Sequence, residues 1–314
     1  MEETPVGSRS LSRDERKRLM AKRDGPGLLT FTLQTAGLVV FSLLTLRLAA
    51  EGHPLRFVTV TFAGLAMLTF FASMHESGHG TAFAAPWLNR AVLWISAPIM
   101  LQSPTFFREF HFEHHRSTSD PYKDPEVSGL PNVLGEWPGN PIFYLTEASG
   151  QHLLTGKAAF TLACALLPFD AMFDRFFPFL RRSLRSRVAW ESRFVVAIHV
   201  IGFWAGWTMV PGFSTLMLAW PIAHLGLGLF VLPEHTGLPR TGTQIHRTRT
   251  TLGNTLLRRA MWNMSYHAEH HACPSVPFHA ADELHRILGP ELEHVSPGYL
   301  AFHAEAFRRS IGRH

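Results

Sequence analysis

The amino-acid sequence predicts an all-α integral membrane protein with four transmembrane helices arranged as two hairpins. Of its 314 residues, 46% are hydrophobic and only 17% are charged. The hydrophobic residues are concentrated in four long runs, and a bilayer span needs about 17 to 25 mostly apolar residues. Clusters of basic residues flank these runs on one predicted side of the membrane, which sets the orientation.

The four runs form two pairs, each with a short turn between its members. They cover residues 28–50 and 55–74, around the turn at 51–54, and residues 194–210 and 213–232, around the turn at 211–212. Two shorter apolar runs, residues 91–101 and 158–168, cannot cross a bilayer at about 1.5 Å of rise per residue. We expect these two to form short interfacial or re-entrant helices, with ordinary buried helices as the alternative.

Two hairpins place the remaining segments, residues 1–27, 75–193 and 233–314, on one side of the membrane. Because these segments carry the arginines and lysines next to the spans, that side is predicted to be cytoplasmic. We expect a multi-pass protein of a bacterial inner membrane, built as one domain over residues 1–314. Anionic lipid headgroups explain the formal net charge of +5. The basic residues follow no recognisable nucleic-acid motif, so nucleic-acid binding is excluded.

Eight of the nineteen histidines lie in three clusters at helical spacing, close to the predicted spans. The clusters are His75-Glu-Ser-Gly-His79, His111-Phe-Glu-His114-His115 and His267-Ala-Glu-His270-His271. Residues three and four apart share a face of an α-helix, so each cluster presents two or three imidazoles in one direction. Burying eight imidazoles near apolar segments is costly unless something binds their lone pairs. Since one zinc ion takes about four ligands in all, the number of histidines implies two metal ions.

Other residues that can bind metals give weaker signals. The two cysteines, Cys164 and Cys273, exclude a disulfide framework and a four-thiolate iron–sulfur site, and we interpret Cys273 as a small apolar filler rather than a ligand. His199 and His224 lie inside the second hairpin, where an ionisable residue is a candidate for function; a neutral histidine bonded to a neighbouring helix is the alternative. The remaining histidines are expected at the surface without a role: His53, His152, His246, His279, His285, His294, His303 and His314.

The three clusters, in this order and with their flanking residues, resemble the histidine motifs of the membrane fatty acid desaturase superfamily. The second cluster continues as His-His-Arg-Ser-Thr-Ser-Asp-Pro-Tyr-Lys-Asp-Pro-Glu over residues 114–126, and the third lies in a motif that extends from Trp262 to His279. The resemblance covers residues 70–290. The superfamily also includes alkane monooxygenases, carotene ketolases and lipid hydroxylases, and all of these enzymes use a non-haem di-iron centre with histidine ligands. The resemblance therefore implies such a centre here, held in a cytoplasmic helical cap.

The resemblance also supplies the expected ligands. Pro233-Glu-His235-Thr-Gly-Leu resembles the Glu-His-x-Gly-Leu stretch of the alkane monooxygenases, which adds His235 to the three clusters. The nine expected iron ligands are His75, His79, His111, His114, His115, His235, His267, His270 and His271. Four carboxylates lie beside ligands, where they could accept the outer N–H of a histidine or simply face solvent: Glu76, Glu113, Glu234 and Glu269.

The implied activity is the O2-dependent oxidation of an unactivated C–H bond in a lipid, and fatty acyl desaturation is the leading expectation. Hydroxylation or ketolation of a lipid, alkane or carotenoid is the alternative, which the motifs do not separate. We expect two iron ions, O2 as co-substrate and a separate electron-transfer protein of the ferredoxin, rubredoxin or cytochrome b5-like kind. No residue other than the metal ligands is assigned a catalytic role.

Two alternatives from other classes use the same histidines. His75, Glu76 and His79 also fit the HExxH motif of zinc metalloproteases, which predicts an intramembrane protease but leaves the other two clusters unexplained. A membrane metal store or a histidine-lined transporter explains the clusters but not their position away from the middle of the membrane. Metal analysis distinguishes the three hypotheses: the desaturase-like enzyme predicts about two irons per chain, the protease one zinc, and the metal store or transporter a variable content.

Overall fold

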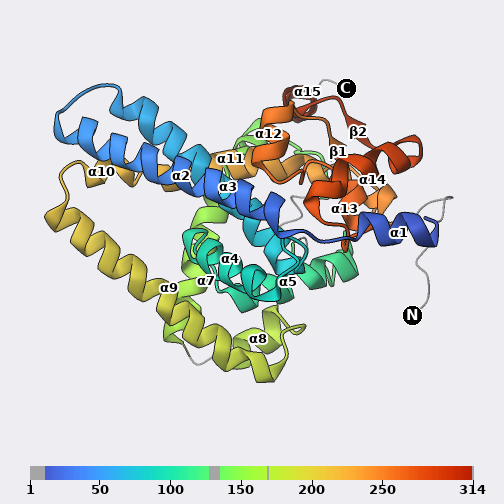
Figure 1. Cartoon of the computed structure of the whole chain (residues 1–314), viewed down its shortest axis with the longest axis horizontal. Coiled ribbons are helices and arrows are strands. Elements are labelled where there is room, and N and C mark those ends of the chain that lie inside the picture. Colours follow the sequence, from blue (N-terminus) through green and yellow to red (C-terminus); the bar gives the residue numbers. More distant parts are fainter. Residues whose placement is uncertain (1–10, 127–134, 168–169, 313–314) are drawn as a thin grey trace.

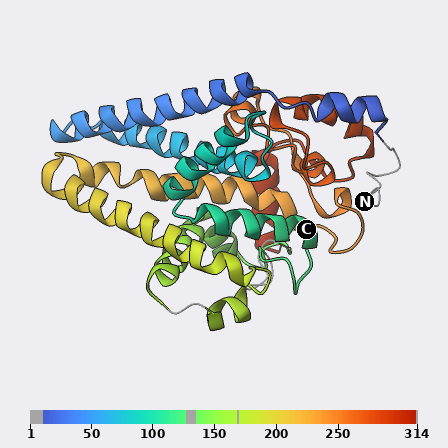
Figure 2. The same cartoon turned by 60° about the horizontal axis from the view of Figure 1, so that its bottom comes forward.

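A computed structural model describes residues 11–126, 135–167 and 170–312 and is mostly helical. The longest helices extend together to one side, and the shorter elements of the C-terminal region gather at the opposite end (Figures 1 and 2). This division follows the sequence, because the long helices contain the four apolar runs and the shorter elements contain most of the polar residues between and after them.

Within the described residues, four helical stretches are long and apolar enough to cross a membrane, which confirms the four predicted spans. The first two are α2 (Asp24–Ala50) and α3 (Arg56–His79), which pack along each other. The others are α9 (Arg182–Met209) and the consecutive helices α10 (Phe213–Leu216) and α11 (Ala219–His235). Large apolar side chains on α2, such as Leu29 and Leu33, are exposed, as lipid-facing residues would be.

The third and fourth spans differ from the predicted runs. α9 begins at Arg182 rather than at residue 194, because its first turns carry arginines that an apolar run does not count. The fourth span is interrupted between α10 and α11. Pro221 has no N–H to bond the carbonyl of Met217. The chain turns there through hydrogen bonds that span three residues instead of four, from Leu218 N to Thr215 O at 3.1 Å and from Trp220 N to Met217 O at 3.4 Å.

The two short apolar runs are helical, as expected, and both helices start earlier than predicted. They are α4 (Pro86–Ile99) and α7 (Gln151–Leu166); residue 168, the end of the second run, lies outside the described residues. Between them lie α5 (Pro104–Ser117) and α6 (Pro141–Ser149), and α8 (Asp170–Phe176) follows. The Ser103 hydroxyl caps α5 by accepting from Phe106 N, and Pro104 occupies its first turn. These two signals fix the start of the helix that carries the second histidine cluster.

A close approach between helices requires glycine at position 150. Gly150 joins α6 to α7 with φ of 62°, and a Cβ built there would lie 1.7 Å from the carbonyl oxygen of His224 in α11. Glycine adopts this left-handed conformation readily, and it has no Cβ to clash with the carbonyl. The α6–α7 corner therefore packs directly on the backbone of the fourth span.

The C-terminal region consists of short elements folded over the ends of α3 and α11. In chain order they are η1 (Ile245–Arg247), β1 (Thr250–Thr251), α12 (Thr255–Ala260), α13 (His267–Ala272), η2 (Phe278–Ala280), α14 (Ala281–Leu288), η3 (Gly289–Glu291), β2 (Val295–Ser296) and α15 (Tyr299–Ser310). β1 and β2 form a parallel pair with Thr250 opposite Val295. The predicted basic N-terminal segment contains helix α1 (Arg13–Leu19), which docks here: Leu19 is buried with Leu284, and Arg18 pairs with Glu283 at 2.6 Å.

A buried chain of polar contacts connects the third histidine motif to the first span pair. The Trp262 indole N–H donates to Gln34 Oε1 at 2.8 Å, and Gln34 Nε2 donates to Ser73 Oγ at 2.9 Å. Ser73 lies two residues before His75 in α3, and its hydroxyl is also 2.9 Å from that of Ser96 in α4. Since a buried polar group is costly without a partner, this chain fixes α2, α3, α4 and the third motif relative to one another.

Candidate metal centre

Each of the three histidine clusters lies on a helix, as its spacing predicts. His75 and His79 occupy the last turns of α3, the second cluster lies on α5, and the third forms most of α13. His235 is the last residue of α11. These four helices come together where α3 and α11 meet the C-terminal region, so segments far apart in the sequence place their imidazoles side by side.

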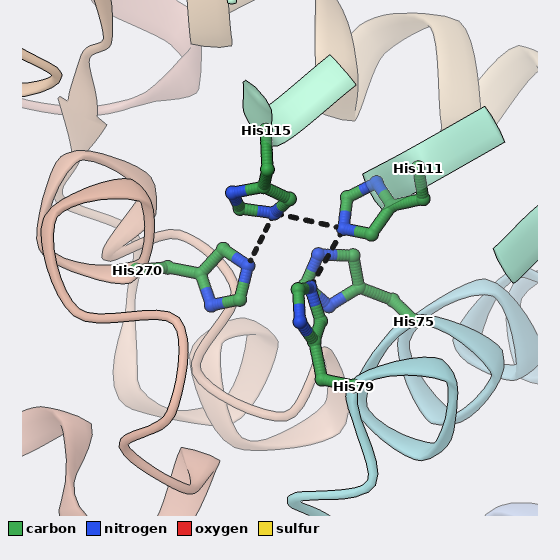
Figure 3. A group of neighbouring side chains, drawn as sticks. All are labelled: His75, His79, His111, His115 and His270. Atoms are coloured by element: carbon green, nitrogen blue, oxygen red, sulfur yellow. Dashed lines mark hydrogen bonds between the residues drawn. The ribbon is translucent and has the colours of Figure 1, made fainter. Parts of the chain in front are cut away.

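Among the described residues, the nine histidines predicted as ligands form two groups. In each group, one ring nitrogen from every histidine lies within 4.8 Å of the corresponding nitrogens of the others. The first group contains His75, His79, His111, His115 and His270, and the second contains His114, His235, His267 and His271. Figure 3 shows the first group, whose imidazoles point toward one another from α3, α5 and α13. The geometry thus brings together all nine residues and divides them between two sites.

Helix geometry explains the division. Consecutive residues of an α-helix point about 100° apart, and residues four apart nearly coincide in direction. The pairs His75 and His79, His111 and His115, and His267 and His271 each stay within one group. His114 and His270, which lie next to a member of such a pair in the sequence, point to the other group. Adjacent histidines therefore serve different sites.

The first group contains more close contacts than hydrogen bonding can satisfy. Nε2 of His111 lies 2.8 Å from Nε2 of His79 and 3.0 Å from that of His115, which is in turn 3.1 Å from Nε2 of His270. A neutral ring nitrogen either donates one hydrogen bond or accepts one. In this row of four nitrogens, at most two of the three contacts can be hydrogen bonds. Both ring nitrogens of His75 are also buried without a hydrogen-bond partner.

The second group shows the same convergence. Nε2 of His267 lies 3.0 Å from that of His235, and Nε2 of His114 lies 3.3 Å from that of His271. Metal–imidazole bonds of about 2.0–2.1 Å separate neighbouring ligand nitrogens by roughly 2.8–3.4 Å around a tetrahedral or octahedral ion. Because the Nε2–Nε2 distances of both groups fall in this range, their residues fit two metal ions.

Burial keeps most of these imidazoles outside the membrane spans neutral. Desolvation, assisted by neighbouring histidines, holds the pKa of His111, His115 and His270 well below the usual value, and the same holds for His267 and His271. A neutral imidazole offers the lone pair that a metal ion requires. The electrostatics of the site therefore favour a cation bound between the rings over protons on them.

His114 has a carboxylate partner that the sequence reasoning missed. Its Nδ1 lies 3.0 Å from both carboxylate oxygens of Asp124, which is fully buried. Although burial lowers the pKa of His114, Glu126 and Asp124 raise it to about 9. Their negative charge equally favours a metal ion at Nε2. The one available sequence signal for Asp124 was its place in the family motif at residues 114–126. Its distance of ten residues from His114 fits no helical spacing, so the sequence did not predict that the two side chains meet.

The four glutamates proposed beside the ligands have different roles. Glu234 Oε1 lies 3.6 Å from His267 Nδ1, and Glu76 Oε1 lies 3.3 Å from His75 Nδ1 without making a hydrogen bond. Glu113 instead contacts Arg116 and accepts from Ser117 Oγ at 3.0 Å. Glu269 is buried and contacts His285 and Thr250. Among the described residues, Glu113 and Glu269 thus make no contact with a predicted ligand, and the buried Glu269 does not face solvent either.

Backbone and hydroxyl groups orient two imidazoles of the second group. The carbonyl oxygen of Arg247 lies 3.2 Å from His235 Nδ1, and the Arg247 guanidinium donates to the Thr118 carbonyl at 2.7 Å. Thr118 Oγ1 lies 3.3 Å from His271 Nδ1. With their Nδ1 atoms engaged, both imidazoles direct Nε2 toward the group. Arg247 therefore connects the residues after α11 to the helix that carries the second cluster.

The residues set aside in the sequence lie outside both groups. Nδ1 of His224 is 2.9 Å from the Trp220 carbonyl, and Nδ1 of His199 is 2.8 Å from the Val195 carbonyl, both within their own helices. Cys273 packs with apolar residues. His53 is exposed, and His152, His246, His279 and His294 are partly buried; residue 314 lies outside the described residues.

Several of the histidines expected at the surface have contacts, and those of His303 and His285 reach other helices. His303 Nε2 donates to the Leu229 carbonyl at 2.8 Å. This carbonyl lacks its helical donor because Pro233, four residues later, has no N–H. His285 contacts Glu269 and stacks on Tyr266. Both residues are partly buried, and the sequence did not predict their contacts.

Replacing Asp124 by asparagine should lower metal affinity or activity about tenfold to a hundredfold, the usual effect of losing a carboxylate that orients a metal-bound histidine. The change keeps the shape of the side chain but removes the charge behind His114. Metal titration of the purified variant measures the effect. Glu113→Gln is the matched control, since Glu113 contacts no ligand histidine. Equal metal affinity in Asp124→Asn and the wild type would contradict the assignment.

Comparison with known proteins identifies the family that this chain resembles. A model of the fatty acid desaturase family matches residues 52–303. The sphingolipid delta(4)-desaturase of Candida albicans is 24% identical over 256 residues, covering 74% of this chain and 62% of that protein. A sphingolipid delta(4)-desaturase DES1-like protein of Arabidopsis thaliana is 25% identical over 222 residues, covering 69% of this chain and 57% of that protein.

A mouse relative has a name that includes two reactions. This protein, sphingolipid delta(4)-desaturase/C4-monooxygenase DES2 of Mus musculus, is 22% identical over 245 residues, covering 77% of this chain and 68% of its own length. The chain spans about three fifths of the length of the Candida and Arabidopsis proteins. All three relatives are eukaryotic, so they lend no support to the expected bacterial membrane.

Proposed function

This chain belongs to the fatty acid desaturase family, and we propose that it is a membrane-bound, O2-dependent non-haem di-iron oxidoreductase that desaturates a long hydrocarbon chain of a lipid. The observation that carries the proposal is the convergence of nine histidines into two groups at the ends of α3 and α11. We treat residues 1–314 as one desaturase-like domain, with a separate protein as the electron donor.

The proposed metal ligands are the five histidines of the first group for one iron and the four of the second for the other. Iron bound there would supply the reduction of O2 and the abstraction of hydrogen from an unactivated C–H bond. The protein itself holds the imidazoles neutral and directed inward, and it excludes water by burying most of them. Asp124 fixes His114, and Arg247 fixes His235 through its carbonyl.

Desaturation is the leading reaction, and hydroxylation is the second. The names of two relatives specify delta(4)-desaturation of sphingolipids, and the mouse protein's name adds a C4-monooxygenase activity. Both reactions begin at a C–H bond of a long lipid chain. We therefore propose an acyl or sphingoid chain as substrate, with hydroxylation or ketolation as the alternative outcome.

The grouping also argues against the protease alternative. Glu76, the general base in that reading, has one carboxylate oxygen 3.1 Å from Thr81 Oγ1. His75 and His79 lie among three histidines from the other clusters. An HExxH zinc site would require neither those three nor the second group. About two irons per chain are expected in the purified protein, and one tightly held zinc would favour the protease.

Mass spectrometry of host lipids tests the function. Expression of the chain with an electron donor should produce lipids that lack two hydrogens, and hydroxylation would instead add one oxygen. His115→Ala, which removes a member of the first group, is the negative control. If lipids from cells with the wild-type chain and with His115→Ala are identical while the wild type holds its iron, the proposed function is wrong.

We further propose that the four spans form two hairpins with the histidine groups on the cytoplasmic side. Tyr122 and Leu300, each 89% exposed, belong to the segments 75–193 and 233–314 that this arrangement places on the cytoplasmic side. His53 lies in the turn between α2 and α3, which the arrangement places on the other side. In a variant with Cys164 and Cys273 replaced by serine, a membrane-impermeant maleimide should label His53→Cys in intact cells. It should label Tyr122→Cys and Leu300→Cys only after the membrane is opened. Labelling of positions 122 and 300 from opposite sides would refute the arrangement.

A further inference from the structure

A cleft of about 510 Å³ lies beside the first histidine group, between the N-terminal end of α9 and helices α4 and α5. Five of its side chains are basic and one is acidic: Lys22, Arg90, Arg108, Arg181, Arg187 and Glu109. Its wall includes residues 77–80, the end of α3. A concave site of this size suits a small ligand or headgroup, and the excess of basic side chains calls for an anion.

The basic side chains keep donors available to a ligand. Lys22 Nζ donates to the Gly80 carbonyl at 2.7 Å, and Arg108 Nε donates to the Gly78 carbonyl at 3.2 Å. Arg90 is exposed and forms no hydrogen bond or ion pair with any residue that the structure describes. An ammonium has three donors and a guanidinium five, so most donors are not used by these contacts.

Glu109 does not neutralise the cleft. Its carboxylate lies 3.7 Å from Arg108 and 3.6 Å from Arg181, so one acid is shared between two cations at long distances. Arg187 pairs at 2.8 Å with Glu191, whose other contacts are to Ser103 and Thr105. The remaining positive charge around the cleft therefore suits a phosphate.

An exposed apolar surface continues directly from the cleft along the predicted spans. In α9, Arg187 shares a face with Phe194 and Ile198, seven and eleven residues later, and both of these side chains are exposed. In α4, Arg90 and Trp94 are four residues apart and both line the cleft. The rings of Trp94 and Phe194 contact each other edge to face with centroids 6.1 Å apart, so the apolar surface crosses from α4 to α9.

We propose that this cleft binds the phosphate-bearing headgroup of an anionic membrane lipid, whose hydrocarbon chains lie along Trp94, Phe194 and Ile198. The charged cleft and the apolar surface match the two parts of such a lipid in the correct order along α9. A tryptophan at their junction is typical of the interface between headgroups and hydrocarbon. A soluble anion would use the cleft but not the apolar surface. His79 of the first group forms part of the cleft wall, but the basic side chains and the apolar surface lie outside both histidine groups, so lipid binding there requires neither iron nor turnover.

Lipid retention measured by native mass spectrometry tests the proposal on the whole purified chain. The protein is reconstituted in equal parts of phosphatidylglycerol and phosphatidylcholine and then transferred to detergent. We expect selective retention of phosphatidylglycerol. The double variant Arg90→Gln/Lys22→Gln should lose this retention by at least about tenfold, because each basic residue near a membrane surface contributes about fivefold in affinity for anionic lipid.

The control removes the same charge at the far ends of α2 and α3. Arg47→Gln/Arg56→Gln should retain phosphatidylglycerol as the wild type does, and thermal unfolding in detergent checks that both variants are folded. Equal retention of the two lipids by the wild type, or unchanged retention in Arg90→Gln/Lys22→Gln, would overturn the proposal. So would displacement of the lipid by an equal concentration of inorganic phosphate. Loss of binding to an acidic ferredoxin in that variant, with lipid retention unchanged, would reassign the cleft to a protein partner.

Discussion

Substitution of His111 by alanine should abolish lipid oxidation and reduce bound iron from about two to about one per chain. Nε2 of His111 lies within 3.0 Å of Nε2 in both His79 and His115, so its loss leaves a gap in the middle of the first group. Removing a ligand should exceed the tenfold to hundredfold effect of removing a residue that merely orients one. Iron analysis and lipid mass spectrometry of the same preparation measure the two effects.

The matched control is His246→Ala. His246 lies outside both groups, and its Nε2 pairs with Glu293 at 2.8 Å. This variant should hold two irons and form product at the wild-type rate. The ligand assignment would be wrong if His111→Ala retained two irons and normal turnover. The other histidines of the group lie on three separate helices, so the variant should stay folded. Gel filtration of His111→Ala checks this and so distinguishes a damaged site from an unfolded protein.

The histidine positions illustrate how far spacing alone determines the site. Spacing places His75 and His79 on one face of a helix, and the structure agrees. The same 100° rule could have predicted that His114 and His115 point to different groups. It could not predict which helices meet, because the contacts between α3, α5, α11 and α13 depend on packing between residues that are 32 to 157 positions apart in the sequence. His235 has no helical partner of its kind, and only the resemblance to a family motif identified it.

The missed features depend on structure between the clusters. Asp124 reaches His114 because the chain turns back after α5, with Ser119 N donating to Asp124 Oδ2 at 2.7 Å. No periodicity signals such a turn. The predicted start of the third span, residue 194, lies well inside α9 because an apolar run marks only the lipid-exposed part of a helix. The first turns of α9 contain Arg185, which is buried and donates to Asp174 at 2.6 Å. The break before α11 was readable from Pro221, which removes one helical hydrogen bond.

His235 is the most informative ligand to test, because it lies outside the three clusters. Its Nε2 is 3.0 Å from that of His267, and the Arg247 carbonyl lies 3.2 Å from its Nδ1. If it binds iron, His235→Ala should lose the iron of the second group and all measurable product formation. The protein should remain folded in detergent, because the first group and the four spans do not depend on this imidazole.

His224→Ala is the decisive comparison for His235. Both residues lie on α11, but His224 is in neither group and its Nδ1 contacts the carbonyl of Trp220 in its own helix. We expect His224→Ala to hold two irons, whereas His235→Ala holds about one. Iron content measured on the two variants side by side separates loss of a ligand from a general disturbance of α11. Full iron content and near-normal product in His235→Ala, together with iron loss in His224→Ala, would transfer the ligand role to His224 and require α11 to lie differently against the second group.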